Sequence, residues 1–393
     1  MLTSAEIANY KSVASASLKF SSENIIVGPN GVGKSNLLDS IHFVRDAVDQ
    51  GLDEAFTVRH GVNSVRRYSK TKPFNISIKL SFSTPEGEGW YRFAISSSAG
   101  EFQILEEEAH WSGKDPFDEN RERMSTARFV RNQNGDIGID ISPYPFGKVP
   151  AFKVHESELA LGQFSNFAIV QYYFDSLISE ITRAGAYSIY PNRIRDPQPI
   201  VGAELLLDDG RNLASIIKQM RSTAARKNKE ALTRAMQQVL PILEEIRIES
   251  AGGYFVPVFR VKDVEDKPAH NLNMSQLSDG TIRMLGMLAA FYQPNRPRRI
   301  TLEEPEQMIH PGLLPVLMEA SRDYLDSDPG RVQTFFTTHS PILLDEFEPE
   351  SIISAHYCEG VSTFAKISPR QLKIVKDGLF TAGELLTSEG IFA

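Results

Sequence analysis

The 393-residue sequence contains a single cysteine, Cys358, which excludes an internal disulfide and a metal centre built from several thiolates. No apolar run approaches the ~20 residues of a membrane-crossing helix, and the densest one, residues 284–292, predicts a buried helix instead. The N-terminus lacks a basic segment followed by an apolar one, so no secretory signal is evident. These absences predict a protein of the reducing cytoplasm that does not associate with membranes.

An excess of basic charge is also missing, because 42 Lys and Arg residues face 50 Asp and Glu residues and the net charge is −8. A protein that coats nucleic acid is usually basic, so bulk affinity for DNA or RNA is not expected, although local basic patches leave room for a nucleic-acid partner. The content of 41% hydrophobic and 23% charged residues fits a globular protein.

Strand and helix patterns alternate along the chain, which predicts an α/β fold with a mainly parallel core sheet. An antiparallel hairpin or meander is expected within 74–111, whereas the polar, Pro- and Gly-containing stretch 112–150 predicts a long loop. Further strands are expected twice within 2–20 and at 24–27, 187–190, 299–302 and 332–338. Helices are expected at 156–185, 213–220, 232–243, 281–292 and 313–325.

The segment Gly28–Ser35, GPNGVGKS, matches the pattern G-x-x-x-x-G-K-[ST] and lies between a short apolar strand and an amphipathic helix. Glycines let the backbone wrap around phosphates, and successive N–H groups and the helix N-terminus then point at the anion. Lys34 is expected to reach the β- and γ-phosphates, and Ser35 to bind Mg²⁺. The predicted phosphate-binding residues of this loop are Gly28, Pro29, Asn30, Gly31, Val32, Gly33, Lys34, Ser35 and Asn36.

A short apolar strand at 300–302 ends in adjacent carboxylates, Glu303 and Glu304. Neighbouring side chains of a strand point to opposite sides, so one carboxylate can hold Mg²⁺ while the other faces an attacking water. We assign Glu303 to the metal and Glu304 to the general base. Because most P-loop proteins carry Asp at the metal position, the longer reach of Glu303 leaves the two roles exchangeable.

Two further motifs follow the same order along the chain. Ser278, Asp279 and Gly280 open the apolar helix before the acidic strand, where a helix N-terminus forms a second anion site. His339 follows the last core strand, where it can hydrogen-bond a γ-phosphate and sense whether it is present.

The order P-loop, LSDGT, EEPE and THS resembles that of ABC-type ATPases. The segments NYKS, GPNGVGKSNLLDSI, LSDGTIRML, EEPEQMIHP and TTHSPILLDEF are similar to the SMC/RecF/OLD-like "AAA family ATPase" group, and the resemblance covers nearly the whole chain. It implies ATP and Mg²⁺ as cofactors and a two-lobed head, with a core lobe of 1–150 and 296–393 and a helical, signature-bearing lobe of 151–295.

The resemblance also implies a head-to-tail homodimer around two ATP molecules, in which Ser278 and Gly280 of one chain cap the γ-phosphate held by Lys34 of the other. The segment 308–311 matches the family's D-loop, and the Q-loop glutamine is either Gln163 or Gln171. One P-loop and one signature per chain favour the dimer independently, because a two-fold axis would complete both sites at once.

Three functions are compatible with these motifs. The first is an ATP-gated head that switches a separate effector, such as a nuclease or toxin, in a bacterial anti-phage or toxin–antitoxin module; the segment after Ser340 is too short for the nuclease domain of OLD-like relatives. The second is a DNA repair or maintenance ATPase. The third is a transporter subunit, which the residues of the motifs disfavour. The basic clusters that would serve DNA are Arg59, Arg66, Arg67, Lys70 and Lys72, and Lys218, Arg221, Arg226, Lys227, Lys229 and Arg234.

Overall fold

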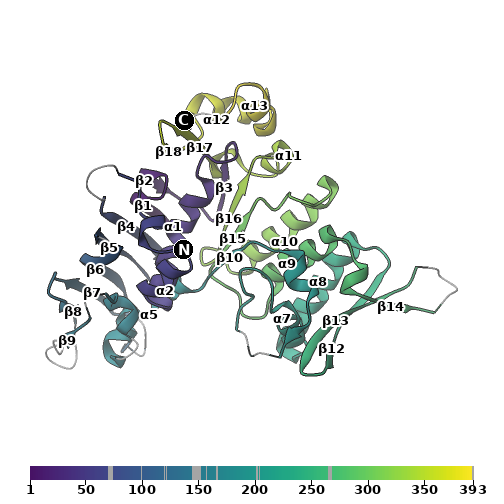
Figure 1. The fold of residues 1–393 in the computed structure, drawn as a ribbon, viewed down its shortest axis with the longest axis horizontal. Coiled ribbons are helices and arrows are strands. Elements are labelled where there is room, and N and C mark those ends of the chain that lie inside the picture. Colours follow the sequence, from purple (N-terminus) through teal and green to yellow (C-terminus); the bar gives the residue numbers. More distant parts are fainter. Residues whose placement is uncertain are drawn as a thin grey trace. The chain divides into compact units, whose positions relative to one another are not determined.

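The computed structural model describes residues 1–69, 74–98, 100–118, 120, 122–143, 152–155, 157–164, 167–200, 202, 204–263 and 268–391. The chain forms two compact units, which are described separately here and drawn in Figure 1. The first comprises Met1–Ala184 and Ser351–Ser368, and the second Gly185–Glu350 and Pro369–Ile391. These boundaries differ from the lobe limits expected near 150 and 296, and the lobes stay a prediction.

The first unit is built on a mixed sheet in the order β3-β17-β18-β2-β1-β4-β5-β6-β7-β8-β9. Parallel pairs join β17 to β3 and β18 to β2, and the other pairs described in this unit are antiparallel. Its strands are β1 (Leu2–Tyr10), β2 (Val13–Lys19), β3 (Glu23–Val27), β4 (Ile76–Thr84), β5 (Gly87–Ser98), β6 (Glu101–Lys114), β7 (Met124–Arg131), β8 (Asp136–Ser142), β9 (Phe152–Lys153), β17 (Ile352–Cys358) and β18 (Val361–Lys366).

Helix α1 is the centre of the first unit's core, where it packs on β1 and β4 and against three other helices. Its Phe43 ring lies against the rings of Tyr10, Phe56 and Phe93, so the helix that follows the P-loop is held by a buried aromatic cluster. The helices of this unit are α1 (Lys34–Asp49), α2 (Leu52–Thr57), α3 (Val62–Val65), α4 (Ala160–Gln163) and α5 (Ala168–Thr182).

The second unit contains β15 parallel to β16, with Glu303 opposite Thr337, and a separate antiparallel sheet in the order β11-β13-β12 with β14 on β13. Its strands are β10 (Ala184–Tyr187), β11 (Gln198–Pro199), β12 (Leu243–Ala251), β13 (Tyr254–Val261), β14 (His270–Asn273), β15 (Arg299–Glu303) and β16 (Gln333–Thr338). Its helices are α6 (Pro191–Arg195), α7 (Leu213–Gln219), α8 (Arg226–Val239), α9 (Asp279–Tyr292), α10 (Leu314–Ser327), α11 (Pro341–Leu344), α12 (Pro369–Lys376) and α13 (Ala382–Ser388).

Helix α9 forms the core of the second unit. It is buried from Ile282 to Tyr292 and packs against α6, α7, α8, α10 and β15. Apart from Arg283, the buried positions carry apolar side chains or glycine on every side of the helix, which explains why it is covered on all sides. Among the described helices, none is both long and apolar enough to cross a membrane.

Most expected elements are confirmed, but the long loop expected at 112–150 is wrong. Strand β6 continues to Lys114, and the chain then returns as the antiparallel strands β7 and β8. The inward positions of β7 are Ser125, Ala127, Phe129 and Arg131, so the period-two pattern exists but is only half apolar. Residues 144–151 lie outside the described part of the chain.

Two expectations in the second unit also need correction. The strand expected at 187–190 is β10, which ends at Tyr187, where the expected strand would begin. The helices expected at 213–220 and 232–243 are present as α7 and α8, but α8 begins six residues earlier than expected and ends at Val239, and the strands β12–β14 that follow were not predicted.

Candidate functional site

The P-loop connects β3, whose last four residues are buried, to the first turn of α1. Gly31 and Gly33 have φ angles of 79° and 97°, a left-handed conformation that side chains other than glycine rarely adopt. A Cβ on Gly28 would lie 2.5 Å from the carbonyl oxygen of Ala355. The glycines of the sequence motif are therefore required by the backbone path itself.

Lys34 is 5% exposed, and its Nζ donates hydrogen bonds to the carbonyl oxygens of Gly28 (2.8 Å) and Pro29 (3.0 Å). The ammonium group thus lies inside the loop, while the N-terminus of α1 has no side-chain cap and Gly33 occupies the N-cap. Uncapped N–H groups, a helix dipole and a buried cation are what a phosphate chain binds, so these residues fit a nucleotide. Ser35 lies exposed in the first turn of α1, where its hydroxyl can coordinate a metal ion bound to the phosphates.

Asn36 connects the start of α1 to two serines through side-chain hydrogen bonds. Its Nδ2 donates to Ser12 Oγ at 2.7 Å, and Ser12 Oγ in turn accepts from Ser362 Oγ at 2.6 Å. A Cβ placed on Gly33 would collide with both serine hydroxyls. Ser12 and Ser362 are therefore supporting residues that sequence reasoning missed, although Ser12 belongs to the NYKS segment quoted for the resemblance.

One turn beyond the P-loop, Asp39 of α1 joins a partly buried polar network. Its carboxylate accepts from Tyr10 Oη (2.6 Å) and Arg59 Nε (2.8 Å) and pairs with Lys11 Nζ (2.6 Å). Burial raises the pKa of Asp39, but the charges of Arg59 and Lys11 outweigh it and hold the pKa below its ordinary value. Arg59, assigned to a basic cluster from sequence, is thus engaged in an internal ion pair, and Lys70 and Lys72 lie outside the described residues.

The acidic pair stands at the end of β15 in the second unit. Glu303 is the last strand residue, and Glu304 leaves the strand with a φ angle of 42°. The N–H of Glu304 is held by the carbonyl oxygen and Oγ1 of Thr337, both at 3.1 Å. A non-glycine residue in this region is strained and persists only where its surroundings fix it. Strain at this carboxylate fits the catalytic role predicted for it.

His339 lies close to two carboxylates. Its Nδ1 is 3.7 Å from Glu304 Oε1 and 3.6 Å from Glu306 Oε1. Glu306 Oε1 also accepts from Thr338 Oγ1 (2.6 Å) and from the N–H of His339 (3.2 Å), so it fixes the backbone that carries the histidine. Glu306 was not predicted as a site residue, because only the fold shows which side chain its carboxylate reaches.

The signature residues occupy the N-terminus of α9, as expected. Ser278 is the N-cap, and its Oγ accepts from the N–H of Thr281 at 3.1 Å. Asp279 pairs with Arg195 at 2.5 Å, and a Cβ on Gly280 would lie 2.7 Å from the carbonyl oxygen of Met308. The close approach of backbone to backbone explains a glycine at position 280.

The two Q-loop candidates lie on different helices of the first unit. Gln163 ends α4, a helix whose first two N–H groups are bound by the buried carboxylate of Glu107. Gln171 lies in the first turn of α5. Both helices pack on α1, so the choice between the two glutamines stays open.

The described parts of the two units thus divide the motifs between them. The P-loop belongs to the first unit, while Glu303, Glu304, His339 and the signature residues belong to the second. Within the described residues, no group of three or more His, Cys, Asp or Glu side chains could hold a metal without further ligands. In nucleotide sites Mg²⁺ usually binds through one or two side chains together with phosphates, and Ser35 and Glu303 are side chains of the kind it takes.

Such a P-loop, together with a signature helix and an acidic strand end in this order, defines an SMC/RecF-like ABC-type ATPase head. The sequence matches the family described as "AAA domain, putative AbiEii toxin, Type IV TA system" over residues 24–345, and the chain belongs to this family. The expected α/β head fold is confirmed by the comparison with a solved structure given next.

Two further comparisons found partial likenesses. A DNA replication and repair protein RecF from Porphyromonas gingivalis, found in two strains, is 44% identical over 57 residues, which are 14% of this chain and 16% of that protein. An SMC head solved bound to the C-terminal winged-helix domain of ScpA is similar with a TM-score of 0.53 and 14% identity over 94% of this chain and 99% of that one. This likeness establishes the fold alone.

Proposed function

We propose that this protein binds Mg-ATP between two copies of itself, hydrolyses it, and thereby switches a separate effector. The observation that supports this most directly is the P-loop geometry, with Lys34 held inside a loop whose glycines adopt left-handed conformations. Lys34 and the N–H groups of the loop bind the β- and γ-phosphates, and Ser35 and Glu303 hold Mg²⁺. Bound Mg²⁺ supplies charge neutralisation at the phosphates.

The chemistry assigned to this chain is proton transfer and positioning. Glu304 takes a proton from the attacking water, and His339, which lies beside it, hydrogen-bonds the γ-phosphate. Ser278 and Gly280 present the N-terminus of α9 to the γ-phosphate bound by the other subunit. ATP then stabilises the dimer, and hydrolysis weakens it because the capped group is lost.

The family description names a putative toxin of a type IV toxin–antitoxin system, and such systems pair two proteins, so the proposal is tested by looking for a second polypeptide. The expected result is that the native protein purified with Mg²⁺ and a slowly hydrolysed ATP analogue has the mass of a dimer and carries a second polypeptide. With ADP, the subunits should separate and the retention of that polypeptide should change. Size-exclusion chromatography with light scattering measures both. A monomer with the slowly hydrolysed ATP analogue would rule out the dimer mechanism.

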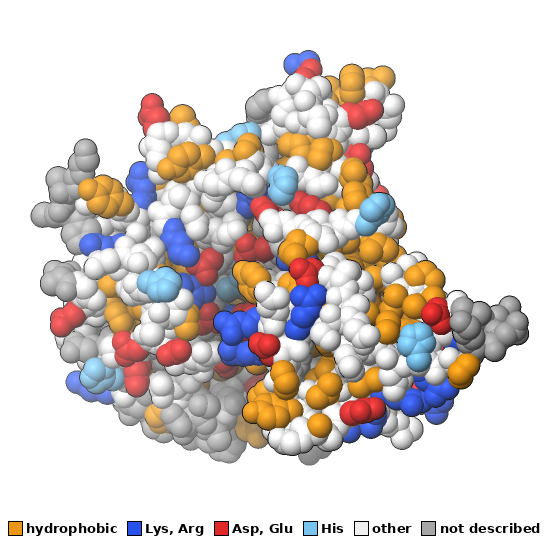
Figure 2. Space-filling model, turned by 45° about the vertical axis from the view of Figure 1, so that its right-hand side comes forward, with side chains coloured by type: hydrophobic (Ala, Val, Ile, Leu, Met, Phe, Trp, Pro, Cys, Tyr) orange, Lys and Arg blue, Asp and Glu red, His pale blue; other side chains and the backbone are white. Residues whose placement is uncertain are grey.

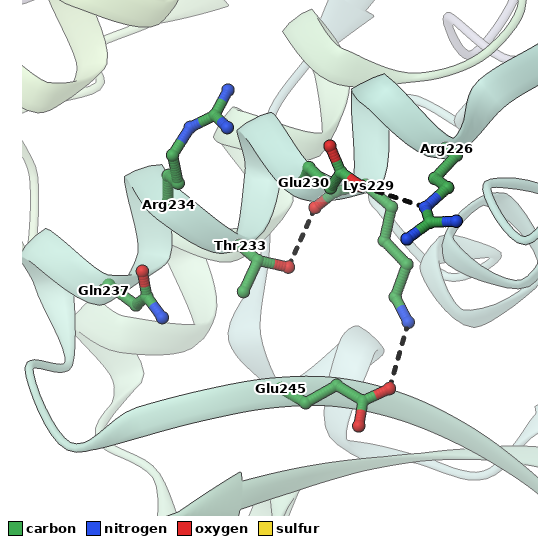
Figure 3. Close-up of a pocket in the computed structure, with 7 residues that line it drawn as sticks. All are labelled: Arg226, Lys229, Glu230, Thr233, Arg234, Gln237 and Glu245. Carbon is green, nitrogen blue, oxygen red and sulfur yellow. Dashed lines mark hydrogen bonds and ion pairs between the residues drawn. The ribbon is translucent and has the colours of Figure 1, made fainter.

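A second candidate function, direct action on DNA, is favoured by the RecF match. The second unit carries cations along α8, and Figure 3 shows Lys229 extended toward Glu245 of β12 beside a cavity of about 400 Å³. Yet four of the six cations predicted for this region already bind groups of their own unit, two of them on α8 and two before it. Figure 2 shows Lys and Arg interspersed with Asp and Glu on the face it presents. The contacts are Lys218 over the Phe255 ring, Arg221 with the Ile248 carbonyl, Arg226 with Glu230, and Lys229 with Glu245.

The two functions differ in their expected response to salt. Direct action on DNA predicts retention in a gel-shift titration, with a binding constant that falls linearly on a logarithmic salt scale. Reversing the exposed charges of α8 with Lys227→Glu and Arg234→Glu should then reduce that slope by about 2, one unit for each lost phosphate contact. The effector role predicts no retention even at low salt. Binding at low salt with an undiminished slope in the variant would place DNA on another surface.

A further inference from the structure

The signature helix contains a buried arginine to which the ATPase motifs assign no role. Arg283 lies in the second turn of α9 and is 7% exposed. Its Nη1 donates to the carbonyl oxygen of Ile189 at 3.0 Å, and its Nη2 donates to the carbonyl oxygen of Glu304 at 3.1 Å. All three residues belong to the second unit. The side chain therefore links the signature helix to the main chain of the proposed general base.

Burial lowers the pKa of Arg283 and removes water from its charge, which destabilises the folded protein unless hydrogen bonds or opposite charges replace that water. The nearby carboxylates of Glu304 and Glu306 oppose that effect. The carbonyl oxygen of Glu304 also accepts from the N–H of Gln307 at 3.1 Å, so Arg283 is one of two donors to this oxygen. Glu304 itself has a left-handed backbone conformation. Moving Arg283 would release part of what fixes Glu304 in its strained conformation.

A second contact connects the same two segments independently. Gly280, at the start of α9, lies so close to the carbonyl oxygen of Met308 that a Cβ there would approach it to 2.7 Å. Met308 itself has a φ angle of 62°. The N-terminus of α9 and the segment from Glu304 to Met308 thus touch at both ends, with Gly280 at one and Arg283 at the other. A shift of the helix start cannot occur without moving the segment that carries Glu304.

We propose that Arg283 is a positioning residue that couples the signature loop to Glu304 of the same chain. The inference rests on the proposed dimer, in which the signature loop of one subunit contacts the nucleotide of the other while Glu304 acts on its own. Arg283 therefore transmits the occupancy of one site to the carboxylate of the second site. Hydrolysis is consequently cooperative, because each site becomes competent when the other holds ATP.

The test compares ATP hydrolysis by the wild type with that of Arg283→Gln and Arg283→Lys over a range of ATP concentrations. The wild type should give a Hill coefficient above 1 and approaching about 2, the number of coupled sites. Arg283→Gln should lower the Hill coefficient to about 1 and kcat by about 10- to 100-fold, the cost of misplacing a catalytic group by roughly 1 Å. ATP binding measured by calorimetry should change by less than about 2-fold, since the P-loop is intact.

Arg283→Lys keeps the charge, but one ammonium cannot span two carbonyl groups as a guanidinium fork does. Its Hill coefficient and its kcat should therefore lie between those of the wild type and those of Arg283→Gln. Arg193→Gln, the same change at an exposed position of α6, should match the wild type. A folded Arg283→Gln variant with an unchanged Hill coefficient would mean that Arg283 only supports packing, and if that variant does not fold, the Hill coefficient of Arg283→Lys decides instead. Hydrolysis by the wild type with a Hill coefficient of 1 overturns the coupling and leaves the proposed function standing. No hydrolysis by the wild type overturns both.

Discussion

Replacing Glu304 with glutamine is expected to stop ATP turnover while ATP stays bound and the two subunits stay together. Glutamine keeps the size of the side chain but cannot accept a proton from water, and removal of a general base costs about 10²- to 10⁴-fold in kcat. The backbone of residue 304 should not move, because Thr337 and Arg283 hold its N–H and its carbonyl oxygen. Steady-state phosphate release, followed by size-exclusion chromatography in Mg-ATP, measures both effects.

The matched comparison is Glu303→Gln at the neighbouring position, the last residue of β15. If Glu303 holds the metal, this variant should need more Mg²⁺ for the same rate and should not accumulate an ATP-bound dimer. The opposite pattern, with trapping by Glu303→Gln and normal turnover by Glu304→Gln, would show that the two carboxylates have exchanged roles. Normal turnover by both variants would contradict the assignment of this strand end to catalysis.

The local elements of the fold were predictable where side-chain periodicity coincided with burial. Strand β3 and helices α1 and α9 are apolar on the faces they bury, and their positions follow from the sequence. Strand β7 was missed because it buries Ser125 and Arg131, and Arg131 lies beside the buried Glu107. Two apolar positions out of four give only a weak signal, and a polar residue such as Arg131 is buried because its partner Glu107 lies opposite it on β6.

In the candidate site, too, the local motif could be predicted from the sequence, whereas the contacts that support it could not. A loop such as GPNGVGKS specifies its own backbone, since the left-handed positions demand glycine wherever the loop occurs. The supporting contacts are not local: Ser12 is hydrogen-bonded to Ser362, 350 positions away, and Glu306 reaches the backbone of His339. Sequence separation hides such pairs, because which strands become neighbours is decided by the topology of the whole unit.

Replacing Lys34 with alanine is expected to abolish ATP binding, and with it every later step. The ammonium is buried among the P-loop carbonyls, so alanine removes both the cation that faces the phosphates and the two hydrogen bonds that shape the loop. Each charged hydrogen bond contributes roughly 1.5–3 kcal/mol, so the dissociation constant for ATP should rise by at least about 100-fold. Calorimetric titration with ATP measures this, and Lys19→Ala, at an exposed position of β2, is the matched control that should bind normally.

Because Lys34→Ala acts before binding and Glu304→Gln acts after it, the two variants should differ in one sizing experiment with Mg-ATP. Both should be inactive, yet Lys34→Ala should elute as a monomer and Glu304→Gln as a stable dimer, since only the latter retains the ligand that joins the subunits. A dimer formed by Lys34→Ala in ATP would mean that the interface does not depend on the phosphates at this loop. That result would contradict the proposed switch even if hydrolysis were lost in both variants.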